Sequence, residues 1–185
     1  MKRILSRVGA FAAAFAFLAL TPGAALACAC GCTVFDIGGM PMMSAANSGQ
    51  VFVEYDFMNQ NRNWSGTSRA PAANNDDKQI RTNFLVVGAQ YNISKDWGVT
   101  VEVPVTNRMF RTENDGGTGV DTFRHTALGD IRLLATYTGL SHDMSTGLTF
   151  GVKLPTGDWK YSGFDRDTSI GSGSSDIVVG GYHVG

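Results

Sequence analysis

Apolar and polar residues alternate in six segments of this chain, at 50–58, 82–93, 97–105, 127–138, 146–154 and 175–183. Successive side chains of a β-strand point to opposite faces of a sheet, so each segment predicts a strand with one apolar face. In the third segment, Val99, Val101 and Val103 fall on one side, whereas Thr100 and Glu102 fall on the other. The pattern therefore predicts an all-β fold.

The connections between these segments alternate in length. Long polar connections are expected at 59–81, 106–126 and 155–174, and short ones at 94–96 and 139–145. Outer-membrane β-barrels have short periplasmic turns and long outer loops, whereas a soluble β-sandwich has no reason to place every long loop at one end. The sequence therefore predicts an antiparallel up-and-down transmembrane β-barrel of the outer-membrane type, over residues 50–185.

The N-terminal residues predict export. Lys2, Arg3 and Arg7 precede an apolar stretch at 8–20, and an A-x-A cleavage site follows at 25–27. This arrangement is typical of a secretory signal peptide, here residues 1–27, and its apolar stretch is too short to be a membrane span. No later segment has about 18 consecutive apolar residues, so no membrane helix is expected. The expected location is the outer membrane of a Gram-negative bacterium.

Charge and composition narrow the class of protein further. Loss of the signal peptide leaves twelve basic against sixteen acidic side chains, a net charge of about −4. A nucleic-acid partner, which requires a basic face, is therefore not expected. The mean hydropathy is near zero, as expected when only one face of each strand meets lipid. Aromatic girdles of a barrel are expected at Tyr55, Tyr91, Trp97, Tyr137 and Tyr182, although aromatic residues are also common in ordinary strands.

The faces opposite the apolar ones carry charge and amides. The candidates for a barrel lumen are Glu54, Asp56, Gln90, Asn92, Glu102, Asp130, Arg132, Lys153 and Asp176. If the strands pair in sequence order, Glu102 lies beside Arg132, and Asp130 lies beside Lys153. Two interpretations stay open: the pairs are structural and fill the lumen, or they form a charged constriction that selects solutes by sign.

Two segments carry a family resemblance. The first is Leu-Gly-Asp-Ile-Arg-Leu at 128–133, continuing to residue 137, and the second covers 147–158 with Gly-Ser-Gly-Ser-Ser-Asp at 171–176. Together they resemble the outer-membrane transporter family labelled as the meta-pathway of phenol degradation, over residues 50–185. The resemblance implies a channel for aromatic and other hydrophobic compounds, with no enzymatic step and no defined set of site residues.

The strand number departs from that family, whose chains are longer. Six strands cannot close a bacterial barrel, since such barrels begin at eight strands. An open edge in lipid leaves backbone groups unpaired, each costing several kcal/mol by a rough estimate. We therefore expect either a C-terminally truncated fragment or a chain that needs a partner to close.

All three cysteines, Cys28, Cys30 and Cys32, lie in a periplasmic N-terminal tail expected at 28–49. Cys28 is a candidate for lipidation, although Leu26 is one place away from the usual position. The three thiolates, with nearby methionines, are candidates for a soft metal such as Cu(I) or Zn, although the usual C-x-x-C spacing is absent. The third alternative is an oxidised tail with one disulfide and an odd thiol, open to a periplasmic partner.

No enzyme is expected. His125, His142 and His183 lie far apart, and no Gly-x-Ser-x-Gly nucleophile motif is present. The expected function is passage of small solutes, hydrophobic or aromatic ones among them, through an outer-membrane channel in contact with lipid. Two alternatives are an anchored barrel whose Cys/Met tail binds a soft metal or a redox partner, and a structural barrel without transport.

Overall fold

A computed structural model describes residues 46–114 and 116–183. The predicted signal peptide at 1–27 and the candidate metal and lipidation residues Cys28, Cys30 and Cys32 lie outside the described residues. So does most of the tail at 28–49. These predictions stay untested.

The described chain is all-β, as predicted. One sheet holds seven strands, β1 (Ser48–Gln60), β4 (Asp77–Asn92), β5 (Trp97–Glu113), β6 (Val120–Leu128), β7 (Arg132–Tyr137), β8 (Thr146–Lys153) and β9 (Asp176–His183). A second, minimal sheet pairs β2 (Trp64–Ser65) with β3 (Ser68–Arg69), next to the 3-10 turn η1 (Ala72–Asn74). An apolar helix of membrane-crossing length does not occur among the described residues.

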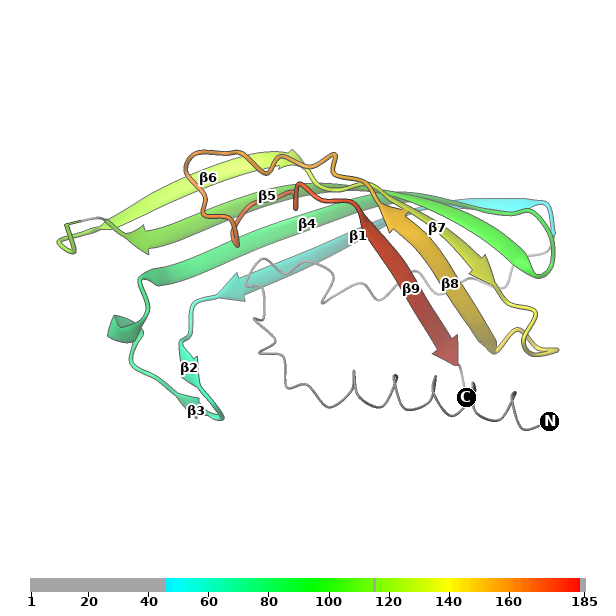
Figure 1. Cartoon of the computed structure of the whole chain (residues 1–185), viewed down its shortest axis with the longest axis horizontal. Coiled ribbons are helices and arrows are strands. Elements are labelled where there is room, and N and C mark those ends of the chain that lie inside the picture. Colours follow the sequence, from blue (N-terminus) through cyan, green and yellow to red (C-terminus); the bar gives the residue numbers. More distant parts are fainter. Residues whose placement is uncertain (1–45, 115, 184–185) are drawn as a thin grey trace, which may run out of the picture.

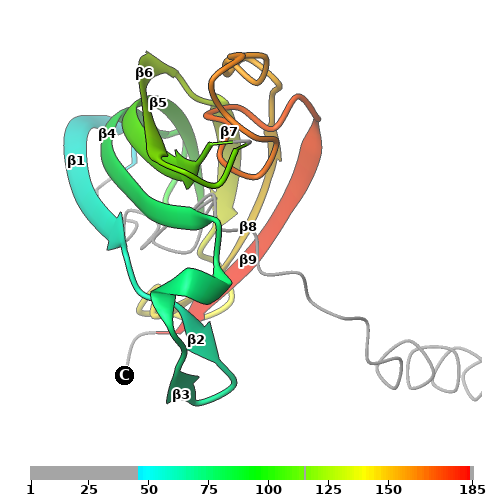
Figure 2. The same ribbon diagram turned by 90° about the vertical axis from the view of Figure 1, so that its left-hand side faces the viewer.

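The seven-stranded sheet is antiparallel throughout and strongly curled (Figures 1 and 2). Its order is β1-β4-β5-β7-β8-β9, with β6 also paired to β5. Within the described residues, β1 pairs only with β4 and β9 pairs only with β8, so the sheet is not closed. The prediction of about six strands was one strand too low.

One predicted strand, 127–138, is wrong because the structure breaks it at 129–131. Strand β5 pairs on one side with β4 along nearly its whole length, and on the other side with β6 and β7 in succession. Pro104 lies in β5 opposite the break, where its carbonyl accepts a hydrogen bond from Gly129 N at 2.9 Å. Opposed residues of such a pair normally exchange two hydrogen bonds. Proline has no N–H to return the second one, so the ladder is interrupted there.

The expected long loop at 106–126 is also wrong, because most of it is the hairpin of β5 and β6. The apolar residues that marked the strand end at Val105. Beyond it, the strand continues with polar residues such as Asn107 and Arg111 on the face that was apolar before. For the same reason, the connection expected at 59–81 shortens to 61–76, whereas the long connection between β8 and β9 is present at 154–175.

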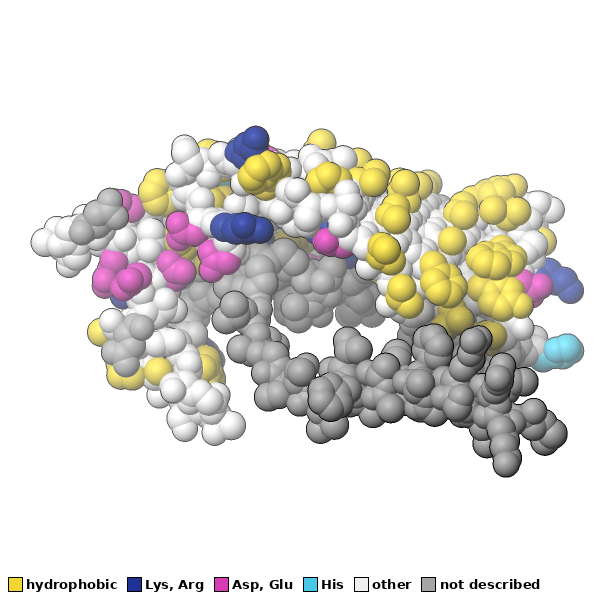
Figure 3. All heavy atoms as spheres, in the orientation of Figure 1, with side chains coloured by type: hydrophobic (Ala, Val, Ile, Leu, Met, Phe, Trp, Pro, Cys, Tyr) yellow, Lys and Arg dark blue, Asp and Glu magenta, His cyan; other side chains and the backbone are white. Residues whose placement is uncertain are grey.

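The two faces of the sheet differ in chemistry and exposure. The outer face carries an apolar band of exposed side chains, Val51, Val53, Tyr55, Leu85, Val87, Tyr91, Trp97, Val99, Val101, Leu128, Leu133, Leu148, Phe150, Val152, Ile177 and Val179. Ile177 is 84% exposed and Val51 is 74% exposed. Figure 3 shows these apolar atoms gathered over the end of the sheet that holds β7, β8 and β9. The inner face of the same strands carries polar and charged residues.

Aromatic residues lie near both ends of the apolar band. Trp97 and Tyr137 meet at one end with ring centroids 4.9 Å apart, and Tyr55 lies at the other. Tyr182 does not join them, because it lies on the inner face opposite Gly147, where its hydroxyl donates to Met144 O at 3.2 Å. A side chain at position 147 would collide with the Tyr182 ring. This register moves Tyr182 out of the expected girdle.

Candidate functional site on the inner face

Four charged side chains form a row across the inner face. Glu102 lies opposite Arg132, Arg132 lies opposite Lys153, and Lys153 lies opposite Asp176 in the strand register. Directly opposed residues share a face, so we call these four residues the charged row. Arg132 Nε lies 2.8 Å from Glu102 Oε2, and Lys153 Nζ pairs with Asp176. The Glu102 residue is only 3% exposed, so this pair is largely shielded from water.

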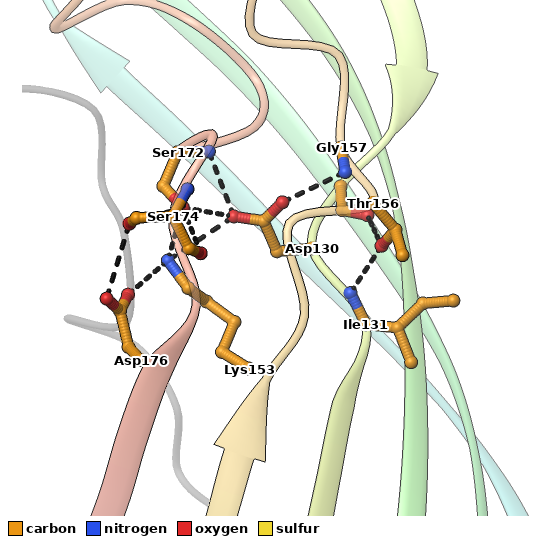
Figure 4. Close-up of polar contacts among 9 residues, drawn as sticks. Asp130, Ile131, Lys153, Thr156, Gly157, Ser172, Ser174 and Asp176 are labelled. Atoms are coloured by element: carbon orange, nitrogen blue, oxygen red, sulfur yellow. Dashed lines mark hydrogen bonds and ion pairs between the residues drawn. The ribbon is translucent and has the colours of Figure 1, made fainter.

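Asp130 lies at the break between β6 and β7 and joins the charged row (Figure 4). Its Oδ2 lies 3.3 Å from Lys153 Nζ, so both ion pairs expected from the sequence are present. Its Oδ1 accepts from Gly157 N at 2.9 Å, and its Oδ2 accepts from Ser172 N and Oγ at 2.9 and 2.6 Å. One carboxylate therefore holds the break and both ends of segment 154–175 together.

Thr156 completes the junction. Ile131 N donates to Thr156 Oγ1 at 2.9 Å, and that hydroxyl donates to Gly129 O at 3.1 Å. A non-proline residue at position 104 would donate its backbone N–H to Gly129 O. The threonine hydroxyl therefore substitutes for the donor that the strand lacks.

Two glycines make the junction compact. A Cβ at Gly157 would lie 2.7 Å from Gly171 Cα, and a Cβ at Gly171 would lie 2.4 Å from the Gly157 carbonyl carbon. Only glycine fits such an approach of two backbones. The motifs at 128–133, 153–158 and 171–176 are thus distant in sequence but meet at one place. Each motif is recognisable in the sequence, but the contact between them is not, because the Thr-Gly and Gly-Ser-Gly pieces indicate it only once the strand pairing is known.

The structure does not bring every candidate into this cluster. Gln90 lies on the inner face of β4 and accepts a hydrogen bond from Gln50 Nε2 at 2.8 Å. Asn92 donates to Ser48 Oγ at 3.3 Å. Glu54 and Asp56 lie on β1, where the register places them opposite Val86 and Phe84 rather than opposite a charge. The clustered candidates are therefore Glu102, Asp130, Arg132, Lys153 and Asp176.

A second cluster, which the sequence analysis missed, lies at the other end of the inner face. The His125 ring stacks on the Tyr161 ring with centroids 4.0 Å apart, and its Nε2 lies 2.8 Å from Asp158 Oδ2. The backbone N–H of Lys160, followed by the His125 ring, holds the pKa of the Asp158 carboxyl below its ordinary value. His183 is elsewhere, bonded to Thr146 Oγ1. The aromatic residues of 155–175 were the available signal.

The chemistry of the charged cluster is ionic. Lys153 Nζ donates to Ser172 Oγ and lies between the carboxylates of Asp130 and Asp176. An ammonium held by two carboxylates is a poor base for activating the serine hydroxyl. Across residues 46–114 and 116–183, no group of three or more His, Cys, Asp or Glu side chains is arranged to hold a metal ion.

Comparison with known proteins adds no relative. No family model matches the chain, and no curated protein matches it. The family resemblance of segments 128–137 and 147–176 therefore stays a prediction.

Proposed function

We propose that the sheet is part of the wall of an outer-membrane β-barrel and that small solutes pass along its inner face. The observation that carries this proposal is the exposed apolar band on the outer face, opposite a charged inner face. Soluble monomers rarely expose contiguous apolar patches larger than a few hundred Å². Fully burying one Val, Leu, Ile or Phe side chain is worth about 1.5–3 kcal/mol, so lipid contact would stabilise this face strongly.

The length of the band supports the same proposal. Along β5 the apolar positions of the outer face run from Trp97 to Val105, nine residues. A tilted strand needs about 9–11 residues to cross a bilayer. On β4, β5 and β6 the band ends at a hydrogen-bonded polar row, in which Tyr55 Oη donates to Asn83, Asn83 to Asn107, and Asn107 to Thr126, at 2.8, 3.3 and 2.6 Å. Such a row suits the boundary between lipid and water.

The charged row and Asp130 supply the selectivity of the passage. They place three carboxylates and two cations on one face, in the Glu102–Arg132 pair and in the group of Asp130, Lys153 and Asp176. Fixed charges at a constriction favour or oppose solutes by their sign. The edges β1 and β9 must also be paired by further strands, because backbone groups left unpaired in lipid cost several kcal/mol each, by a rough estimate.

The mutual pairing of these charges equally suits a structural barrel without transport. Liposome swelling separates the two functions. The full chain is inserted into vesicles, and swelling is followed with small sugars and amino acids of either charge. Swelling that is faster than in protein-free vesicles supports passage of solutes. A change in the preference for positive or negative solutes in Lys153→Met assigns that preference to the charged row. Full insertion without swelling supports the structural barrel, and failure to insert contradicts both.

A further inference from the structure

The connection between β8 and β9 is far longer than its ends require. These two strands are antiparallel neighbours, which a turn of two residues can join, yet 154–175 supplies twenty-two residues. The chain instead runs beside β6 at the far end of the sheet from the apolar band (Figures 1 and 2). We call residues 154–175 the strap.

Arg108 holds the middle of the strap from the inner face of β5. Its Nε donates to Thr82 Oγ1 at 3.0 Å, and its Nη1 donates to the carbonyls of Thr168 and Ser169 at 2.5 and 2.9 Å. Arg108 is 2% exposed, and Thr168 is fully buried. A buried guanidinium is costly unless its N–H groups are satisfied. Two of its acceptors belong to the strap, so burying Arg108 and fixing the strap are coupled.

Aromatic side chains fasten the strap at a second place. Phe164 packs edge-on against Phe110 at 6.3 Å and against Tyr161 at 5.0 Å, while Tyr161 stacks on His125. Phe110 is 1% exposed, and like His125 it projects from the inner face of the β5–β6 hairpin. The strap therefore covers this part of the inner face instead of extending into solvent.

The base of the strap is closed on itself. Gly171 N donates to Asp158 O at 2.9 Å, and Asp130 binds both Gly157 and Ser172. The segment between residues 158 and 171 is thus a compact loop whose ends are close together, as in an Ω-loop. Its position is set at the base, by Arg108 and by the aromatic contacts.

We infer that the strap narrows the passage and sets the size limit of the solutes that cross it, with Arg108 as the residue that fastens it. This inference rests on the proposed function, since a size limit requires a passage. It adds a specificity element that is separate from the charged row. Solutes selected by sign at the charged row are selected by cross-section at the strap.

Trypsin cleavage tests the fastening without reference to transport. Lys160 and Arg166 are exposed cleavage sites in the strap, and Arg62 and Arg69 in the 61–76 connection serve as internal references. In detergent-solubilised full chain, Arg108→Met is expected to raise cleavage at Arg166 at least tenfold relative to the reference sites.

The matched control is Arg111→Met, three residues along β5 on the outer face. It is expected to leave strap cleavage as in the unmodified chain. Equal cleavage at Arg166 in the unmodified chain, in Arg108→Met and in Arg111→Met would overturn the role of Arg108.

Liposome swelling tests the size limit. Because residues 158 and 171 are already hydrogen bonded, Asn-Gly can replace residues 159–170 with little displacement of the ends. The shortened chain is expected to admit larger sugars than the unmodified chain. An unchanged size limit, with swelling present in both, overturns this inference and leaves the proposed function standing. No swelling in either chain, with insertion intact, means that the passage itself fails and the size limit with it.

Discussion

Strands β4 and β5 run through both halves of the sheet, but their outer face is largely apolar in one half and largely polar in the other. In the first half of β5, Val99 and Val101 are on the outer face, and Glu102 is on the inner face. In the second half, Asn107 is on the outer face, and Phe110 is buried on the inner face. The strand period is two throughout. The comparison teaches that the surroundings of each half, rather than strand geometry, determine the polarity of the outer face.

The largest expected effect comes from breaking the shielded ion pair in the half that holds the apolar band. Arg132→Met removes the cation 2.8 Å from Glu102, whose side chain is 4% exposed. Removing one partner of a buried ion pair costs about 3–5 kcal/mol. Urea unfolding in vesicles is expected to show this loss, whereas Lys78→Met, which breaks the more exposed Lys78–Glu113 pair in the other half, is expected to cost about 0–1 kcal/mol. Similar losses at both sites would contradict the comparison.

The next largest expected effect on stability comes from placing a charge on the outer face, and it should differ between the two halves. Val101→Lys places a charge in the middle of the apolar band, and a cation at the bilayer midplane of a barrel costs about 2–4 kcal/mol. Asn107→Lys, on the same face of the same strand but beyond the band, is expected to cost at most about 1 kcal/mol. The midpoint of urea unfolding in vesicles measures both. Equal costs would mean that lipid does not distinguish the two halves.

A smaller effect is expected where the halves join. Gly171→Ala places a methyl group 2.4 Å from the Gly157 backbone, and overpacking of this kind typically costs 1–3 kcal/mol. Gly180→Ala is the matched control, because its nearest neighbour would be 3.9 Å away. The thermal unfolding temperature should fall for Gly171→Ala and stay nearly constant for Gly180→Ala. An unchanged unfolding temperature in Gly171→Ala would show that the backbones at residues 157 and 171 can move apart without loss of stability.

The smallest expected effect is the loosening of the strap at low pH. The pKa of Asp158 is lowered in the folded chain by the Lys160 N–H and by His125. A lowered carboxyl pKa stabilises the fold above the unfolded value of about 3.9, and this stabilisation is lost as pH falls through the lower folded value. The strap should therefore stay fastened at neutral pH and loosen below about pH 4. Fluorescence of Trp159 as a function of pH measures this, and Asp158→Asn should reduce the response, the remainder coming from Asp130 at the base of the strap. A response of unchanged size in Asp158→Asn would assign it to other groups.

Sequence alone predicted the half that holds the apolar band better than the other half. Apolar alternation at Val99, Val101 and Val103 identified β5, and the assumption that strands pair in sequence order placed Glu102 beside Arg132. The same criterion failed beyond Val105, because there neither face of β5 is uniformly apolar. The outer face carries Asn107 and Arg111, and the inner face carries Arg108 beside Phe110, both in contact with the strap. A contact between segments sixty residues apart, such as Arg108 with Thr168, leaves no periodic pattern.

The break in the strand at 129–131 was missed for a related reason. Proline within a segment weakens the prediction of that segment, but Pro104 interrupts the pairing of a different one. Its effect appears only when β5 and β6 are known to be neighbours. The charged candidates Glu54 and Asp56 were correctly placed on the face opposite Val53 and Tyr55, but their distance from the charged row depends on strand order as well as on period.

Fluorescence quenching by lipids brominated in mid-chain tests the central claim most directly. Single-tryptophan chains are prepared with Trp64, Trp97 and Trp159 replaced by Phe, and with Val101→Trp or Asn107→Trp added. In vesicles, the Val101→Trp chain is expected to be strongly quenched and the Asn107→Trp chain to be nearly unaffected. Equal quenching of the two, or no quenching of Val101→Trp in chains that have inserted, would contradict the assignment of the apolar band to lipid.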